Sequence, residues 1–233
     1  MASDEELAST RRLLDRRGCA RVTPFISAQV VNAVAAETIW LADFAAVRRD
    51  LTVIETDSTP RRMCNITRAQ IAKYGTVIPS AYRSSAVTDA VSRIAGEPVF
   101  ACPYEPEQFV ITRLERREDT HGWHWDDYSF ALVWVAECPP SADGGFVEYV
   151  PDTVWDKRRP GVQQILRDRT VHRLDVGARD VYLMRADTTL HRVHPIQRGR
   201  RTIVNMAFAT ARELCREVSH ETMDALWSTA GTE

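Results

Sequence analysis

The sequence lacks the features that would direct it to a membrane, out of the cell or onto a nucleic acid. Its 233 residues contain no apolar run of about 18 or more, and the N-terminus has no apolar signal-peptide region. The formal net charge is -2, which gives no overall positive field for nucleic acid or an anionic surface. We therefore expect a cytoplasmic protein with a small-molecule partner and neither a membrane nor a nucleic-acid partner. The oligomeric state stays open.

Cysteines are few and scattered, at residues 19, 64, 102, 138 and 215, and no C-x-x-C pair occurs. This odd number and wide spacing predict reduced thiols rather than a disulfide framework or a zinc site. Repeats, low-complexity tracts and long linkers are missing as well. Because the chain is long enough to bury a full core, we expect a single domain over residues 1–233.

Helical patterns dominate the first hundred residues. The stretch from Ser27 to about residue 50 predicts a helix with Ser27 as its N-cap and four apolar residues on one face: Val30, Val34, Leu41 and Phe44. A strand-like LTVIE follows. SSAVTDAVSRIAGEP predicts a second helix, with Ser84 as N-cap and Gly96 just past its end.

After residue 100 the pattern changes to short segments rich in β-branched and aromatic residues, such as EQFVITRLERR, YSFALVWVAEC and RRTIVNMAFAT. The tail ARELCREVSHETMDALW is helical again. We therefore predict an α+β fold with three parts. Residues 1–100 form a mainly helical buttress, residues 101–212 an antiparallel barrel or double-sheet roll, and residues 213–233 a C-terminal helix.

The segment HGWHWDDYSF, residues 121–130, gathers the residues suited to metal binding. In a strand His124 and Asp126 share one face, while Trp125 faces away. An imidazole and a carboxylate side by side can chelate a metal, but a facial iron site needs a second histidine. The candidates are His172, His191, His194 and His220. On its own the pair is also what an ordinary strand-end histidine beside an aspartate looks like.

A second polar pattern lies in RRTIVNMAF. Arg201, Ile203, Asn205 and Ala207 share one face of this strand-like segment. An arginine and an asparagine on an otherwise apolar face suit a barrel whose interior holds a charged ligand, because a guanidinium can pair bidentately with a carboxylate.

Taken together, His124-x-Asp126, His191 and Arg201 resemble the Fe(II)/2-oxoglutarate-dependent dioxygenases, whose core is a double-stranded β-helix. The run HRVHP is similar to the H-x-V-x-P run of that superfamily, which favours His191 over His194. The resemblance implies Fe(II) on His124, Asp126 and His191. It further implies 2-oxoglutarate as co-substrate with its far carboxylate on Arg201, and O2 as oxidant.

HGWHWDDYSFALVWV is similar to the branch of this superfamily that acts on free cationic amino acids, which contains radical halogenases and hydroxylases best known for lysine. The halogenases have a small residue, typically Gly, at the position of Asp126. The carboxylate here therefore implies hydroxylation of a free L-amino acid, with L-lysine as the first candidate and succinate and CO2 as co-products.

The same resemblance implies a set of substrate contacts: Glu107, Asp127, His121, Asn205, either Arg61 or Arg62, and Trp227. A carboxylate is the natural partner of a substrate ammonium, although a surface charge at Glu107 and core packing at Trp227 are the ordinary alternatives. Three other functions remain open: a hydroxylase of a carrier-bound or peptidyl residue, an amino-acid halogenase, and a non-catalytic binding barrel.

Overall fold

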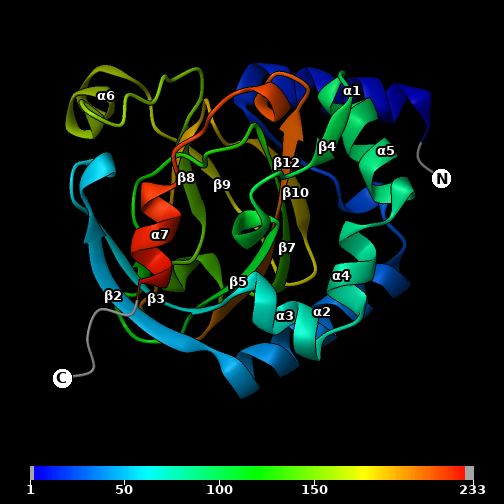
Figure 1. Cartoon of the computed structure of the whole chain (residues 1–233), viewed down its shortest axis with the longest axis horizontal. Coiled ribbons are helices and arrows are strands. Elements are labelled where there is room, and N and C mark those ends of the chain that lie inside the picture. Colours follow the sequence, from blue (N-terminus) through cyan, green and yellow to red (C-terminus); the bar gives the residue numbers. More distant parts are fainter. Residues whose placement is uncertain (1–2, 229–233) are drawn as a thin grey trace.

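The computed structural model describes residues 3–228, and within that range the chain forms an antiparallel β-core flanked by helices (Figure 1). The helices are α1 (Asp4–Arg17), α2 (Ala28–Ala45), α3 (Arg68–Tyr74), α4 (Val77–Tyr82), α5 (Ser85–Ala95), α6 (Val162–Asp168) and α7 (Glu221–Trp227). The strands are β1 (Cys19–Arg21), β2 (Val47–Val53), β3 (Thr59–Ile66), β4 (Val99–Ala101), β5 (Phe109–Leu114), β6 (Thr120–His121), β7 (Phe130–Glu137), β8 (Val147–Val150), β9 (His172–Leu174), β10 (Val181–Arg185), β11 (Leu190–Val193) and β12 (Arg201–Thr210).

Two sheets make up the core of the described residues. The larger has the order β1-β10-β7-β12-β5-β3-β2, with β4 on β12 and β6 on β3, and the smaller has the order β11-β8-β9. All their pairings are antiparallel. Sheets flanked by helices agree with the α+β class that the sequence predicts.

Alternation along the central strands divides the core into two layers. On β7, Phe130, Leu132 and Trp134 belong to the apolar cluster that the helices cover, and Ala131, Val133 and Val135 belong to a second cluster on the opposite face of the sheet. Helix α2 packs directly on β7 and β12. The helices thus bury one face of the larger sheet and leave the other to form the wall of an interior space.

Helix α2 begins as the sequence predicts but buries a different stripe. The Ser27 side chain accepts a hydrogen bond from Val30 N at 3.3 Å. Val30 and Phe44, expected on the buried face, are 38% and 60% exposed. Residues on the neighbouring stripe are buried instead: Val31, Val34, Ala35, Thr38, Leu41 and Ala42. The assignment of Val30 and Phe44 to the core was wrong, because apolar residues occupy two adjacent stripes of this helix.

The first hundred residues hold elements that the sequence pattern misses. Helix α1, for which no specific pattern was identified, has a capping box between Ser3 and Glu6 and ends at Gly18, whose φ is 70°. Strand β2 covers residues 47–53 and confirms in part the strand-like LTVIE, whereas β3 was not expected. The two strands pair with each other, and β3 joins them to the larger sheet through β5. At the other end, the described part of the expected C-terminal helix contains a 3-10 turn at Glu213–Cys215 and then α7, and residues 229–233 lie outside the described residues.

All five cysteines are free. Cys19, Cys64 and Cys102 are buried, and burial raises the pKa of the Cys19 thiol to about 11. Among residues 3–228 no helix is both long and apolar enough to cross a membrane.

Glu37 of α2 holds the start of α4 in place. Its Oε2 accepts hydrogen bonds from Thr76 N at 2.8 Å and Val77 N at 2.9 Å, and its Oε1 accepts one from Ile78 N at 2.7 Å. These three donors have no partner within their own helix, because the first turn of a helix leaves its N–H groups unpaired.

We expect Glu37→Ala to lower the free energy of unfolding by about 1–3 kcal/mol, because it leaves charge-assisted hydrogen bonds unmade. Glu37→Gln, which keeps an acceptor oxygen, should lie in between. Urea denaturation measures the change. Asp89→Ala is the control, because Asp89 is an exposed residue of α5. An unfolding free energy for Glu37→Ala equal to that of the control would contradict this role.

Candidate metal and substrate site

His124 and His191 lie opposite each other across an isolated antiparallel bridge. His124 N donates to His191 O at 2.8 Å, and His191 N donates to His124 O at 2.9 Å. Residues directly opposite in such a pair point to the same side. The two imidazole rings therefore lie together, with centroids 4.1 Å apart.

Backbone carbonyls orient both rings. His124 Nδ1 lies 2.7 Å from Gly122 O and His191 Nδ1 lies 2.8 Å from Thr189 O. Because a carbonyl only accepts, Nδ1 is the protonated nitrogen in each neutral ring and Nε2 keeps its lone pair. The Nε2 atoms lie 3.6 Å and 3.8 Å from Oδ1 of Asp126. One donor atom from each of the three residues falls within 4.8 Å of the others.

This donor set fits Fe(II). Two imidazoles and one carboxylate on one side of an ion are the facial arrangement of non-haem iron sites, and Nδ1–H bonded to a carbonyl is their usual outer support. Burial, together with neighbouring His121 and His191, lowers the pKa of His124 well below its ordinary value, which keeps the ring neutral as a ligand must be. Burial raises the pKa of Asp126, while His191 and a hydrogen bond from Asn205 lower it.

The other candidate histidines lie elsewhere. His194 turns away from the cavity: its Nδ1 is 3.0 Å from Glu148 Oε2 and its ring stacks on Phe146. His172 contacts Arg17 at the surface. The geometry thus selects His191 from the four histidines that the sequence left open.

Arg201 lines the same cavity as the three candidate metal ligands. This cavity has a volume of about 100 Å³, and its wall includes His124, Asp126, His191, Arg201, Ile203 and Asn205. The last three come from one face of β12, as the alternation predicts, whereas Ala207 packs in a separate cluster with Cys102 and Tyr128. Arg201 is 2% exposed. Its Nη2 lies 3.4 Å from the Tyr182 hydroxyl, and its Nε meets no hydrogen-bond acceptor among the described residues.

An adjoining cavity of about 60 Å³ holds most of the expected substrate contacts, and its wall includes Arg61, Glu107, His121, Asp127, Met223 and Leu226. Arg61 is buried, whereas Arg62 is exposed, so the arginine at the cavity is Arg61. Its guanidinium donates only to neutral oxygens of Thr56, Thr59 and Pro60. Burial lowers the pKa of Arg61 to about 9.

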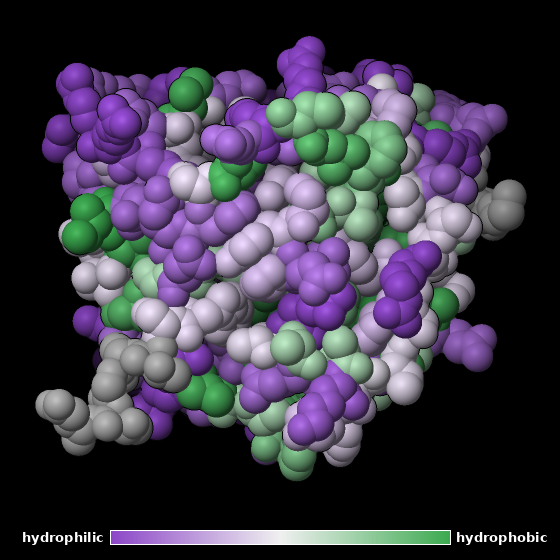
Figure 2. All heavy atoms as spheres, in the orientation of Figure 1, coloured by the Kyte–Doolittle hydropathy of each residue, from purple (hydrophilic) through white to green (hydrophobic). Residues whose placement is uncertain are grey.

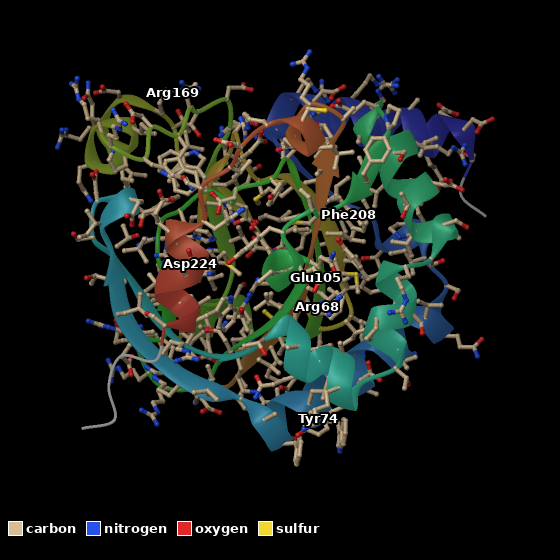
Figure 3. All side chains as sticks on the ribbon, in the orientation of Figure 1. Arg68, Tyr74, Glu105, Arg169, Phe208 and Asp224 are labelled. Atoms are coloured by element: carbon tan, nitrogen blue, oxygen red, sulfur yellow. The ribbon has the colours of Figure 1, made fainter. Side chains whose placement is uncertain are left out.

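Glu107 is the last residue of a short 3-10 turn, Glu105–Glu107. Arg68 of α3 contacts this turn and the residue after it. Arg68 lies 3.6 Å from Glu105 and donates to Gln108 Oε1 at 3.3 Å, and Figure 3 shows Arg68 beside Glu105. Glu107 is 6% exposed, and within residues 3–228 its Oε2 has no hydrogen-bond partner. Burial, and then Asp127, raise the pKa of Glu107 well above its ordinary value.

Asp127 lies among groups that the sequence did not connect with it. Lys157 Nζ is 2.6 Å from Asp127 Oδ1. His220, one of the four candidate second histidines, lies with Nδ1 3.6 Å from Asp127 Oδ2, and its ring stacks on Tyr104 at 3.6 Å between centroids. Sequence reasoning missed Lys157 and did not place His220 beside Asp127, because each comes from a segment without a motif.

Helix α7 supplies part of the cavity wall. Met223 and Leu226 line both cavities. Trp227, expected to close over the pocket, packs instead with Met63 and Leu114, and within the described residues it lines neither cavity. In Figure 1, α7 (red) lies in front of the strands, and it packs against β2.

A larger groove of about 730 Å³ lies between α2, α4 and α5, on the helical side of the larger sheet. Its wall is made of apolar and small polar side chains, and none of the described residues that line it is ionisable. The groove therefore lacks the charges that an amino acid requires, and the two cavities around Asp126 remain the candidate site.

A family model described as HalD: Halogenase D matches residues 2–228. No curated protein matches the chain.

Solved structures of 2-oxoglutarate oxygenases share the fold. The epimerase SnoN, in complex with Fe3+, alpha ketoglutarate and nogalamycin RO, is 16% identical, with a TM-score of 0.64 over 90% of this chain and 85% of that one. A 2OG-Fe(II) oxygenase family oxidoreductase from Burkholderia pseudomallei is 14% identical, with a TM-score of 0.60 over 90% and 93%. A prolyl hydroxylase from Trichoplax adhaerens is 14% identical, with a TM-score of 0.61 over 93% and 98%. The expected double-stranded β-helix is confirmed.

Gly122 lets β6 approach β3. Its N–H donates to Pro60 O at 2.8 Å, while its carbonyl accepts from His124 Nδ1. A Cβ at this position would lie 2.6 Å from Pro60 O, which is too close for any side chain.

We expect Gly122→Ala to displace the carbonyl that orients His124 and to weaken Fe(II) binding by about 10–100-fold, the usual effect of losing such a support. Anaerobic calorimetric titration measures the affinity. Gly177→Ala is the matched control, because a Cβ there would meet only Asp180, at 3.8 Å. Equal Fe(II) affinity in the two variants would show that the Gly122 carbonyl does not position the ring.

Proposed function

The chain belongs to the halogenase D family, and on that premise we propose that this Fe(II)/2-oxoglutarate-dependent oxygenase hydroxylates a free cationic L-amino acid, with L-lysine as the first candidate. We propose further that the chain works as one domain, because β2 and β3 from its first half pair into the same sheet as β5.

In this proposal His124, Asp126 and His191 hold the iron, and the Gly122 and Thr189 carbonyls keep both Nε2 atoms turned toward it. Fe(II) with 2-oxoglutarate and O2 supplies the oxidation of an unactivated C–H bond, with succinate and CO2 as co-products. Arg201 pairs with the far carboxylate of 2-oxoglutarate. Its burial and unpaired Nε support that role, since a desolvated guanidinium gains most from a carboxylate.

The observation that carries hydroxylation is the Asp126 carboxylate. Its Oδ1 lies within 4 Å of both histidine Nε2 atoms, where a third ligand belongs. The halogenases that this chain resembles have a small residue at that position, which leaves room for chloride. Asp126 fills the place with a protein oxygen, and this favours hydroxyl transfer.

Opposite charges at the second cavity support a free amino acid as substrate. Arg61 is a buried cation without a carboxylate partner in the described part of the chain, so it suits the substrate carboxylate. Glu107 and Asp127 suit ammonium groups. His121 and Asn205 line the cavity beside the proposed metal ligands and can give the substrate further polar contacts. Met223 and Leu226 take the wall position that Trp227 was expected to have.

A halogenase is the second candidate, and the name of the matching family favours it. A hydroxylase of a carrier-bound or peptidyl residue is a third. Hydrophilic residues cover much of the face in Figure 2, and hydrophobic ones appear there in small groups, so this face offers no broad apolar area for a docked carrier.

The function is tested by incubating the protein with Fe(II), 2-oxoglutarate, O2 and chloride, with each free amino acid in turn. We expect L-lysine to stimulate succinate formation and to yield a product heavier by one oxygen. His191→Ala should abolish this stimulation, whereas His194→Ala, three residues on and turned away, should keep it. Mass spectrometry and succinate release are the measurements.

Each departure from that result has a distinct meaning. A chlorinated product would replace hydroxylation by halogenation and show that Asp126 does not exclude halide. Failure of every free amino acid to stimulate succinate release would remove the free-substrate part of the proposal. Full stimulation in His191→Ala would overturn the ligand assignment.

For Arg201→Ala we expect the KM for 2-oxoglutarate to rise at least about tenfold, which corresponds to about 1.4 kcal/mol, because a buried carboxylate loses its partner. Arg200→Ala is the matched control, since Arg200 is exposed and pairs with Glu137 at 3.0 Å. Steady-state succinate release measures both. An unchanged KM in Arg201→Ala would remove this residue from the co-substrate site.

A further inference from the structure

Lys157 lies beside the substrate cavity although no sequence motif contains it. Lysine occurs only twice in this chain, at residues 73 and 157, whereas all other basic positions except the histidines are arginine. Lys73 is exposed at the end of α3. Lys157 follows β8, in the loop before α6, and its ammonium reaches the carboxylate of Asp127 at 2.6 Å.

Asp127 is shared between that ammonium and the cavity. Its side chain is 1% exposed and forms part of the wall of the 60 Å³ cavity, while Lys157 approaches from outside that wall. A buried carboxylate needs a cation, because desolvation makes an unpaired charge costly. Lys157 supplies this cation from the protein itself.

The charges that remain for a substrate can then be counted. Arg61 has no carboxylate partner in the described chain, and Glu107 Oε2 has no hydrogen-bond partner there. The cavity therefore presents one unmatched cation and one unmatched carboxylate, which is the complement of one substrate carboxylate and one substrate ammonium. A second substrate ammonium finds only Asp127, which Lys157 already holds.

The Lys157 ammonium also contacts groups other than Asp127. Its ammonium donates to the Ser219 carbonyl and hydroxyl, lies 3.2 Å from Glu221 Oε2, and stands 4.6 Å from the ring centre of Trp155. Glu221 is half exposed and begins α7. If a substrate ammonium takes Asp127, Lys157 keeps these outer contacts, so displacement needs only a small movement.

Building on the function proposed above, we propose that Lys157 is a specificity-determining residue whose ammonium competes with a second substrate ammonium for Asp127. It sets the margin by which the enzyme prefers a dicationic amino acid over one of the same length with a single ammonium. Lysine suits this position because its compact ammonium is the group with which it competes, whereas an arginine fork would bind the carboxylate through two hydrogen bonds.

The first test compares Lys157→Met with the parent protein by calorimetric titration of L-lysine and of L-norleucine, which has the same carbon chain but no second ammonium. We expect L-lysine binding to tighten about tenfold in Lys157→Met, because Asp127 then has no competing cation. Norleucine binding should stay within about twofold, the spread expected of an uncoupled site.

Glu221→Gln is the matched control. It removes the α7 side of the same ion-pair network and leaves the ammonium on Asp127. If Lys157 only ties α7 to the core, Lys157→Met and Glu221→Gln should change L-lysine binding alike. Equal effects, or unchanged or weaker L-lysine binding in Lys157→Met, would overturn competition.

A second measurement needs no variant. With two lysines in the chain, an amine-acylating reagent followed by mass spectrometry gives the labelling ratio of Lys157 to Lys73, and a free amine that consumes reagent slows both equally. Saturating L-lysine should raise the ratio by releasing Lys157 from Asp127, whereas norleucine should not. An unchanged ratio under saturating L-lysine would overturn the proposal even if Lys157→Met fails to fold.

The probe n-butylammonium separates this idea from the proposed function, because it carries an ammonium and no amino-acid head. If no free amino acid binds either the parent or Lys157→Met, the free-substrate function fails and the probe alone decides the role of Lys157. Binding of n-butylammonium about tenfold tighter to Lys157→Met than to the parent supports competition, and equal binding overturns it.

Discussion

Two backbone hydrogen bonds between His124 and His191 hold the site together. They form the bridge at which the segment after β6 meets β11, so they join the larger sheet to the smaller one. Because opposite residues project to the same side, the bridge brings two distant histidines together without help from their side chains. Asp126 lies two residues further along, between β6 and β7, and its N–H donates to Ala186 O at 3.1 Å. The ligand positions thus follow from backbone geometry.

Strand alternation is also why part of the site could be predicted from the sequence. It assigned His124 and Asp126 to one face, and Arg201, Ile203 and Asn205 to another, and these are local consequences of an extended chain. The choice of His191 depended on resemblance, because no local pattern says which strand pairs with which. Arg61 and Arg62 show the same limit: alternation says that they point in opposite directions, and only the tertiary fold says which one is buried.

Lys157, His220 and the wall residues of α7 could not be predicted, because their roles arise from packing between segments far apart in sequence. The helix pattern failed for a different reason at α2, where Val30 and Val31 belong to adjacent apolar stripes and only the sheet beneath decides between them. Around the cavities, three buried charged residues lack a partner of opposite charge or a hydrogen-bond partner within the described chain: Arg61, Arg201 and Glu107. Ligands that complete these pairs will stabilise the folded state by mass action.

The proposed metal ligands and part of the cavity wall belong to different parts of the architecture. The ligands stand on or beside strands tied into both sheets, whereas Lys157, Met223 and Leu226 belong to a connecting loop and a short surface helix. Substitutions in the loop and helix therefore leave the backbone of the ligand strands intact. A change in the loop or the helix can thus reshape the cavity wall while the candidate metal site keeps its backbone hydrogen bonds.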